Sequence, residues 1–311
     1  MKILYGPLFT RRLGISMGID IVPYKTCSYN CVYCHEGETT SLSLARKSFF
    51  EPKKIVQELC LLTGIKQLRG LKIDYLTFAG SGEPTLNQNI GEYIRYLKDV
   101  SPIPVAVLTN SSLLWDEEVR NDLSTADLVV PSLDAASEAI FQRVNRPCPG
   151  FTIDKVIEGL RQFCNEFTGR IWLEILLCSE LNDGKEELHR LADIAAKLDV
   201  DKIQINTVSR SPALHDVCPA SFQTLTYFHG LLGDKGELVQ EESGIIREKL
   251  ERELEDAILK SLRFKPGNMQ TLSQETEKSG QEVIKVLSRL EKEGMIQRYM
   301  LDKTTFYKVV Q

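Results

Sequence analysis

The chain lacks a long uncharged apolar segment that could cross a membrane. No run of about 18 uncharged apolar residues occurs, and the opening MKILYGPLFTRRLG lacks the apolar core of a secretory signal. Hydrophobic residues make up 42% of the chain and charged residues 26%, which is typical of a soluble globular protein. We therefore predict a cytoplasmic protein.

The sequence also lacks an excess of basic residues. Lys and Arg number 38 against 43 Asp and Glu, so the formal net charge is -5. Proteins that coat nucleic acid are usually basic overall, so this composition argues against that class and leaves only a local basic groove open. Internal repeats and low-complexity segments are absent as well. A length of 311 residues then predicts one large domain and one small one.

Cysteine is sparse except in one loop. In CSYNCVYC, Cys27, Cys31 and Cys34 have C-x3-C-x2-C spacing, and His35 follows directly. The other five are scattered singly, and we interpret them as small buried hydrophobic residues, because cytosolic chains rarely carry disulfide frameworks. They are Cys60, Cys148, Cys164, Cys178 and Cys218.

Three neighbouring thiols point to an open metal site. A closed zinc site needs four ligands, and His35 adjoins Cys34 too closely to join the same tetrahedron easily, so we interpret it as a hydrogen-bonding group of the loop. Three thiolates leave one iron of a [4Fe–4S] cluster without a protein ligand. An open coordination position is the mark of a catalytic metal site. The spacing therefore favours an iron–sulfur site over zinc.

Short apolar runs alternate with amphipathic stretches from residue 15 to about 207. Strands joined by helical crossovers predict an α/β fold whose parallel sheet is curled into an open or partial barrel. The expected strands cover 15–23, 73–80, 105–110, 127–134, 171–177 and 202–207. The expected helices cover 51–64, 89–100, 152–167 and 185–198.

Polar residues follow these strands at the edge where such folds bind ligands. After the second strand, the glycines of GSGEPT would allow close backbone approach, and Glu83 could accept hydrogen bonds from a cationic amine. Thr109 and Asn110 end the third strand, where they either bind ribose hydroxyls or a carboxylate or cap the strand. Ser132 and Asp134 stand at the corresponding depth after the fourth strand.

Further charged and polar residues lie on or beside the barrel strands. Asn206 follows the sixth strand, and Glu174 lies inside the fifth, where a buried carboxylate must face the lumen or pair with a buried arginine. Arg11 and Arg12 precede the first strand and either clamp an anionic substrate or remain solvated. In NRPCPG, Asn145 begins a segment that is a rigid turn or a plain loop.

Together these motifs resemble the radical S-adenosylmethionine superfamily over residues 10 to 215. The resemblance rests on the cysteine spacing, on Tyr33 before the last cysteine, and on the GEP motif of Gly82, Glu83 and Pro84. It implies a [4Fe–4S] cluster held by Cys27, Cys31 and Cys34, with S-adenosylmethionine on the free iron. The residues then expected at the cofactor are Tyr33, Gly82, Glu83, Pro84, Thr109, Asn110, Ser132, Asp134, Glu174 and Asn206.

The resemblance also implies a reaction. One electron from a flavodoxin- or ferredoxin-type donor would cleave S-adenosylmethionine to methionine and a 5′-deoxyadenosyl radical. FAGSGEPTLN, VLTNSSLL, PSLDA and NRP make the chain similar to the branch that contains wyosine-type tRNA-modifying enzymes. It departs from those enzymes because it shows neither a flavodoxin-like domain nor a second cysteine cluster.

The character of the sequence changes after residue 232. We predict a partial (β/α)6 barrel over 1–232, a linker over 233–250, and a winged helix-turn-helix over 251–311, with three helices followed by two strands around LDKT. In the expected recognition helix, Lys285, Arg289 and Lys292 are offset by acidic neighbours, so the module suits docking of a macromolecule as well as nucleic-acid reading.

Three functional hypotheses follow. The first is a radical enzyme acting on a macromolecule, with RNA ahead of protein. The second is a radical enzyme acting on a small metabolite, with the winged helix as a regulatory or oligomerisation element. The third is an iron–sulfur redox sensor that regulates transcription, which the GEP turn and the six-strand lumen argue against because a sensor needs neither.

Overall fold

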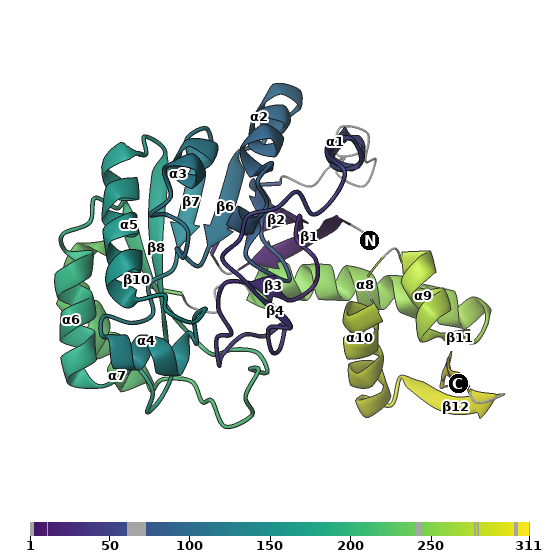
Figure 1. Cartoon of the computed structure of the whole chain (residues 1–311). Helices are drawn as coiled ribbons and strands as arrows, with labels where there is room; N and C mark the ends of the chain where they lie inside the picture. The colour runs from purple at the N-terminus through teal and green to yellow at the C-terminus, as the bar shows by residue number, and fades with distance from the viewer. Residues whose placement is uncertain are drawn as a thin grey trace. The chain divides into compact units, whose positions relative to one another are not determined.

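The computed structural model describes most of the chain (Figure 1). The described residues are 3–10, 12–60, 73–239, 244–276, 278, 280–301 and 304–310. Arg11 lies outside them. The chain divides into two compact units, Met1–Gln240 and Glu241–Gln311, which are described separately below.

The first unit is built on an eight-stranded sheet in the order β1-β2-β5-β6-β7-β8-β9-β10. Its six central strands are parallel and lie within a residue of the predicted ones or inside them, so the predicted α/β fold with a parallel sheet is confirmed. These strands are β2 (Gly14–Ile19), β5 (Tyr75–Phe78), β6 (Val105–Thr109), β7 (Leu128–Pro131), β8 (Arg170–Leu177) and β9 (Lys202–Thr207).

The two edge strands were not predicted. β1 (Leu4–Thr10) pairs antiparallel with β2, and β10 (Gly236–Leu238) pairs parallel with β9. Because β1 and β10 stand at opposite ends of the strand order, the sheet is open. Inside the cysteine loop, β3 (Thr26–Cys27) and β4 (Ser41–Leu42) form a parallel ladder of two residues each.

Helices cover one face of the sheet (Figure 1). Four fall within the predicted stretches: α1 (Pro52–Cys60), α2 (Ile90–Val100), α5 (Ile153–Glu166) and α6 (Lys185–Ala195). Residues 61–64 of the first predicted helix lie outside the described residues. Elements without a sequence prediction are α3 (Glu117–Leu123), α4 (Glu138–Val144), α7 (Phe222–Leu232) and the short turns η3 (Pro84–Leu86) and η4 (Gly233–Lys235).

Alternation along the strands separates two sets of buried side chains. Leu76 and Phe78 of β5 belong to the large core beneath the helices. Tyr75 of β5 faces the other way and packs with Leu128, Val130 and the hairpin residue Leu13 in a smaller apolar cluster. The second face therefore has its own apolar base, and the polar groups described below lie nearer the carboxyl ends of the strands.

The second unit combines three helices with a three-stranded antiparallel sheet of order β11-β13-β12. Its elements are α8 (Gly244–Phe264), β11 (Gly267–Asn268), α9 (Met269–Thr276), α10 (Gly280–Lys292), β12 (Ile296–Leu301) and β13 (Thr304–Val309). Ile258, Leu272 and Leu287 are fully buried in its core.

The boundary between the units differs from the expected linker over 233–250. η4 and β10 extend the first unit, and α8 already begins at Gly244. None of the helices in the described part of the chain combines the length and apolar composition that a membrane span requires.

Candidate active site

The cysteine loop follows β2 and is folded by its own backbone and by aromatic packing. Cys34 N–H donates to the carbonyl of Cys31 at 3.2 Å. Tyr29, only 2% exposed, packs edge-on against Phe141 of α4 with ring centres 5.3 Å apart. These contacts hold Cys27, Cys31 and Cys34 as free, half-buried thiols in one loop.

Each of the three thiols accepts a hydrogen bond from a nitrogen of a different side chain. The nitrogen–sulfur pairs are Lys25 Nζ to Cys34 at 3.2 Å, Asn110 Nδ2 to Cys27 at 3.5 Å, and Asn145 Nδ2 to Cys31 at 3.6 Å. Donors aimed at sulfur are the surroundings that a metal-bound thiolate uses. Sequence reasoning missed Lys25, since a single lysine in a loop carries no signal.

Burial keeps two of these thiols protonated unless a cation binds them. Burial, followed by the charge of Glu83, raises the pKa of Cys27 to about 12. Burial, followed by Cys27 and Asp134, raises the pKa of Cys31 well above its ordinary value. A coordinating metal deprotonates a thiol outright, so these residues suit metal ligation better than free nucleophilic chemistry.

The GSGEPT loop docks on the cysteine loop. The N–H of Glu83 donates to the Thr26 carbonyl at 3.1 Å, and the N–H of Lys25 donates to the Ser81 carbonyl at 3.0 Å. A Cβ at Gly82 would lie 2.0 Å from the Thr26 carbonyl oxygen. Gly82 thus permits the close approach that the sequence suggested, and the structure shows this approach to be toward the cysteine loop.

Glu83 is 2% exposed, and its carboxylate is engaged inside the protein. It accepts hydrogen bonds from Thr85 N (3.1 Å), Thr85 Oγ1 (2.6 Å), Thr109 Oγ1 (2.7 Å) and Asn110 N (2.8 Å). Burial raises its pKa, and these donors oppose that shift. The side chain predicted to receive an amine therefore joins the loop after β5 to the end of β6, and Pro84 begins η3 directly after it.

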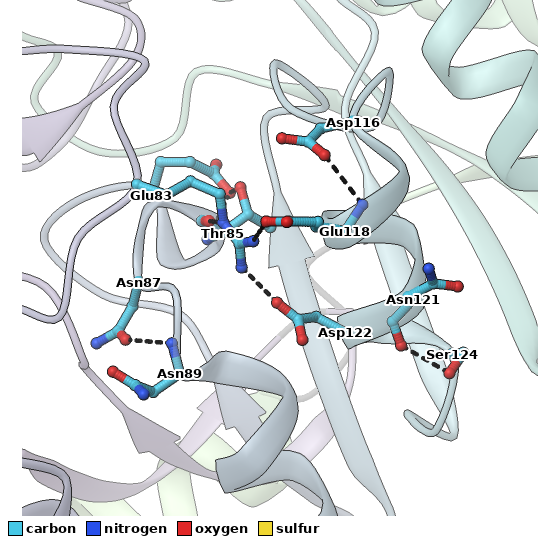
Figure 2. A network of polar contacts seen from close by, with 10 residues as sticks. Glu83, Thr85, Asn87, Asn89, Asp116, Glu118, Asn121, Asp122 and Ser124 are labelled. Atoms are coloured by element: carbon cyan, nitrogen blue, oxygen red, sulfur yellow. Dashed lines mark hydrogen bonds and ion pairs between the residues drawn. The ribbon is translucent and has the colours of Figure 1, made fainter.

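The network continues from Thr85 toward α3, as Figure 2 shows. Arg46 Nε donates to the Thr85 carbonyl at 3.1 Å, and its guanidinium pairs with Asp122 and, at 3.5 Å, with Glu118. The Arg46 side chain is only 12% exposed. An arginine far from the motifs thus supports the GEP turn, which no sequence pattern indicated.

Asp134 lies at the centre of a second network. It accepts hydrogen bonds from the Tyr33 hydroxyl, from Asn145 Nδ2 at 2.9 Å and from the backbone N–H of Leu176 at 3.0 Å. Burial raises the pKa of Asp134 to about 6. Asp134 thereby joins β8 to two residues of the cysteine surroundings. Ser132 is linked instead to the end of β6, because its backbone N–H donates to the Thr109 carbonyl at 2.9 Å.

Glu174 on β8 pairs with an arginine, which is one of the two alternatives that the sequence left open. It forms an ion pair with Arg12 and accepts a hydrogen bond from Asn206 Nδ2 at 2.8 Å. His35 Nε2 lies 3.1 Å from Glu36 Oε1, so it contacts its neighbour in the loop. The predicted residues thus fall into three groups around the strand ends, centred on Glu83, Asp134 and Glu174.

A family model named Radical SAM superfamily matches residues 21–193. The chain belongs to this superfamily. It is 37% identical over 226 residues to UPF0026 protein MJ1312 of Methanocaldococcus jannaschii, covering 73% of this chain and 70% of that protein. It is also 43% identical over 211 residues to a protein named GTPase Obg of Brachyspira hyodysenteriae, covering 67% of this chain but only 30% of that protein.

A solved structure shows the same fold. It is a radical SAM methyltransferase from Sphaerobacter thermophilus, with a TM-score of 0.56 and 16% sequence identity, covering 72% of this chain and 65% of that one. Because the superfamily model matches more than half of the chain, the chain is a radical SAM enzyme, and its cofactors are a [4Fe–4S] cluster and S-adenosylmethionine.

The residues present fit that cluster. Cys27, Cys31 and Cys34 would hold three of its irons, and the side-chain donors of Lys25, Asn110 and Asn145 reach one sulfur each. The fourth iron would have no ligand from this motif and would remain available for S-adenosylmethionine.

Proposed function

We propose that this enzyme cleaves S-adenosylmethionine reductively and uses the 5′-deoxyadenosyl radical to abstract hydrogen from a substrate. A flavodoxin- or ferredoxin-type protein supplies the electron. The observation that carries the proposal is the three-thiol loop, which has one N–H donor per sulfur and is docked on GSGEPT. Three ligands on a four-iron cluster leave the open position that reductive cleavage requires.

Anaerobic reconstitution tests this step. The reduced, iron-loaded protein should form 5′-deoxyadenosine from S-adenosylmethionine, as detected by chromatography. Cys31→Ala should lose both the cluster absorbance and the product, whereas Cys218→Ala, at an exposed cysteine, should retain both. A wild-type protein that keeps its cluster but makes no 5′-deoxyadenosine would instead support the redox-sensor hypothesis.

We further propose that the substrate is a macromolecule bound through residues 251–311. The element order of the second unit supports the predicted winged helix, because three helices are followed by the β12–β13 hairpin and β11 pairs with β13. Such modules dock nucleic acids and proteins. The resemblance of the sequence motifs to those of wyosine-type tRNA-modifying enzymes favours RNA over protein.

The side chains of the β12–β13 hairpin support RNA as the substrate class. Tyr299 and Phe306 are cross-strand partners whose rings stack with centres 6.0 Å apart and planes 27° apart. Lys308 Nζ lies 5.9 Å from the centre of the Tyr299 ring. Both aromatic side chains are half-buried and therefore partly accessible. Aromatic rings beside a cation are the surface on which proteins stack unpaired bases.

The molecules that co-purify with the protein from an anaerobic lysate distinguish an RNA substrate from a protein or a small metabolite. The full-length protein should enrich RNA, and the double variant Tyr299→Ala/Phe306→Ala should lose the enrichment. Phe264→Ala is the matched control, because Phe264 is an aromatic residue of the same unit and is 86% exposed. Enrichment of a protein in place of RNA would overturn the RNA assignment. If no macromolecule co-purifies with the protein, the result would favour a small metabolite as the substrate.

A further inference from the structure

Lys25 is a buried lysine held rigidly beside the cysteines. It is only 2% exposed and adopts a left-handed backbone conformation, with φ of 56°. Its N–H donates to the Ser81 carbonyl at 3.0 Å, and its carbonyl accepts from Thr40 N at 3.2 Å and Ser41 N at 3.0 Å. Three backbone hydrogen bonds therefore fix the point from which the side chain starts.

The Lys25 ammonium is directed at one thiol. Its Nζ lies 3.2 Å from Cys34 Sγ. Within the described part of the chain, no carboxylate lies within ion-pair distance of it.

The three sulfur donors are unequal. Asn110 and Asn145 donate to Cys27 and Cys31 through neutral amides, whereas Lys25 brings a full positive charge to Cys34. Hydrogen bonds that involve an ionised group are roughly twice as strong as neutral ones. The environment of Cys34 is thus electrostatically distinct from that of the other two cysteines.

A buried ammonium is costly unless a negative charge compensates it. Three thiolates around a cluster core of charge two plus give a net charge of minus one, and one-electron reduction makes it minus two. Coulomb attraction to a fixed ammonium therefore grows on reduction, and burial weakens the screening of this attraction by solvent and salt.

We propose that Lys25 stabilises the reduced cluster, raising its reduction potential and drawing negative charge toward the iron bound by Cys34. This role rests on a cluster held by Cys27, Cys31 and Cys34, and it does not depend on the substrate. The redox step is a single electron transferred from the donor protein to the cluster, with no bond made or broken at Lys25. Lys25 acts through Cys34 and is a positioning residue.

The test is the midpoint potential of the reconstituted full-length protein without S-adenosylmethionine, measured by dye-mediated titration with electron paramagnetic resonance. Lys25→Met keeps the side-chain length and removes the charge, so its potential should shift to a more negative value. Lys25→Arg keeps the charge and should stay near the wild type. Lys54→Met is the surface control, because the Lys54 side chain is 74% exposed, and it should cause no shift.

Measuring the midpoint potential at different salt concentrations distinguishes the effect of the buried Lys25 charge from effects of surface charges. The shift in Lys25→Met should persist at high salt, because salt screens buried pairs poorly. An unchanged potential in Lys25→Met with full iron content would overturn the proposal. Loss of the cluster in both Lys25→Met and Lys25→Arg would also overturn it, because the residue would then serve loop folding. Loss of the cluster in Lys25→Met alone would support the proposal, because it would show that the cluster requires a positive charge at this position.

The experiments distinguish failure of the proposed cleavage reaction from failure of the proposed role of Lys25. A wild-type protein that forms no 5′-deoxyadenosine, together with a potential shift in Lys25→Met, would refute the cleavage reaction and leave the role of Lys25 intact.

Discussion

The backbone N–H of Asn110 donates a 2.8 Å hydrogen bond to Oε2 of Glu83. Glu83 belongs to the loop after β5 and Asn110 follows β6, so this bond joins the ends of neighbouring strands. The side chain of Asn110 in turn reaches Cys27 Sγ at 3.5 Å. The carboxylate of Glu83 thus orders the residue that contacts the first cysteine.

Replacing Glu83 by Gln should destabilise the protein. A glutamine presents an amide NH2 to donors that now meet a carboxylate oxygen, which leaves buried groups unsatisfied. The expected loss in the free energy of unfolding is about 1–3 kcal/mol, measurable by urea denaturation of the metal-free protein. Glu118→Gln changes a side chain that is 84% exposed and should leave the midpoint unchanged. Equal midpoints for the two variants would contradict the structural role of Glu83.

Replacing Gly82 by Ala should separate the GSGEPT loop from the cysteine loop. The added Cβ would meet the Thr26 carbonyl oxygen at 2.0 Å, and backbone atoms cannot swing aside as a flexible side chain can. Iron content after reconstitution should fall. Gly184→Ala is the matched control, since its Cβ would meet nothing within 4 Å. Full iron loading of Gly82→Ala would show that the cluster does not need this contact.

The Arg12–Glu174 ion pair should show strong coupling in a double-mutant cycle. Glu174 is 8% exposed, so Arg12→Met leaves a nearly buried carboxylate without its cation. We expect a loss of about 1–3 kcal/mol in unfolding free energy, below the value for a fully buried pair because the Arg12 side chain remains 25% exposed. Adding Glu174→Gln should recover part of this loss. Strictly additive losses would refute the coupling.

Asp134 should make the metal-free protein less stable as the pH rises. Its pKa is about 6 in the folded protein against an ordinary 3.8, because of burial. Since the folded state binds this proton more tightly, the contribution is fully present below about pH 4 and is lost as the pH passes through about 6. The unfolding free energy of the wild type minus that of Asp134→Asn should therefore decline over this range. A constant difference would contradict the raised pKa.

Local patterns determined much of the fold. The six central strands were predictable because each is a short apolar run between amphipathic stretches, and a buried parallel strand needs apolar residues on both faces. β1 and β10 escaped prediction. Gly6 and Pro7 interrupt the apolar residues of β1, and β10 is only Gly236–Leu238, so neither forms a continuous apolar run, and their pairing depends on the strands beside them.

The sequence by itself determined the chemistry of the site, because C-x3-C-x2-C within one loop brings three thiols together by covalent connection. The tertiary structure decided which groups surround them. Asn110 and Asn145 come from the ends of β6 and α4, and Arg12 reaches Glu174 across 162 positions of the chain. Such contacts depend on strand register and on burial, which make an unpaired polar group costly, and no spacing along the chain encodes them.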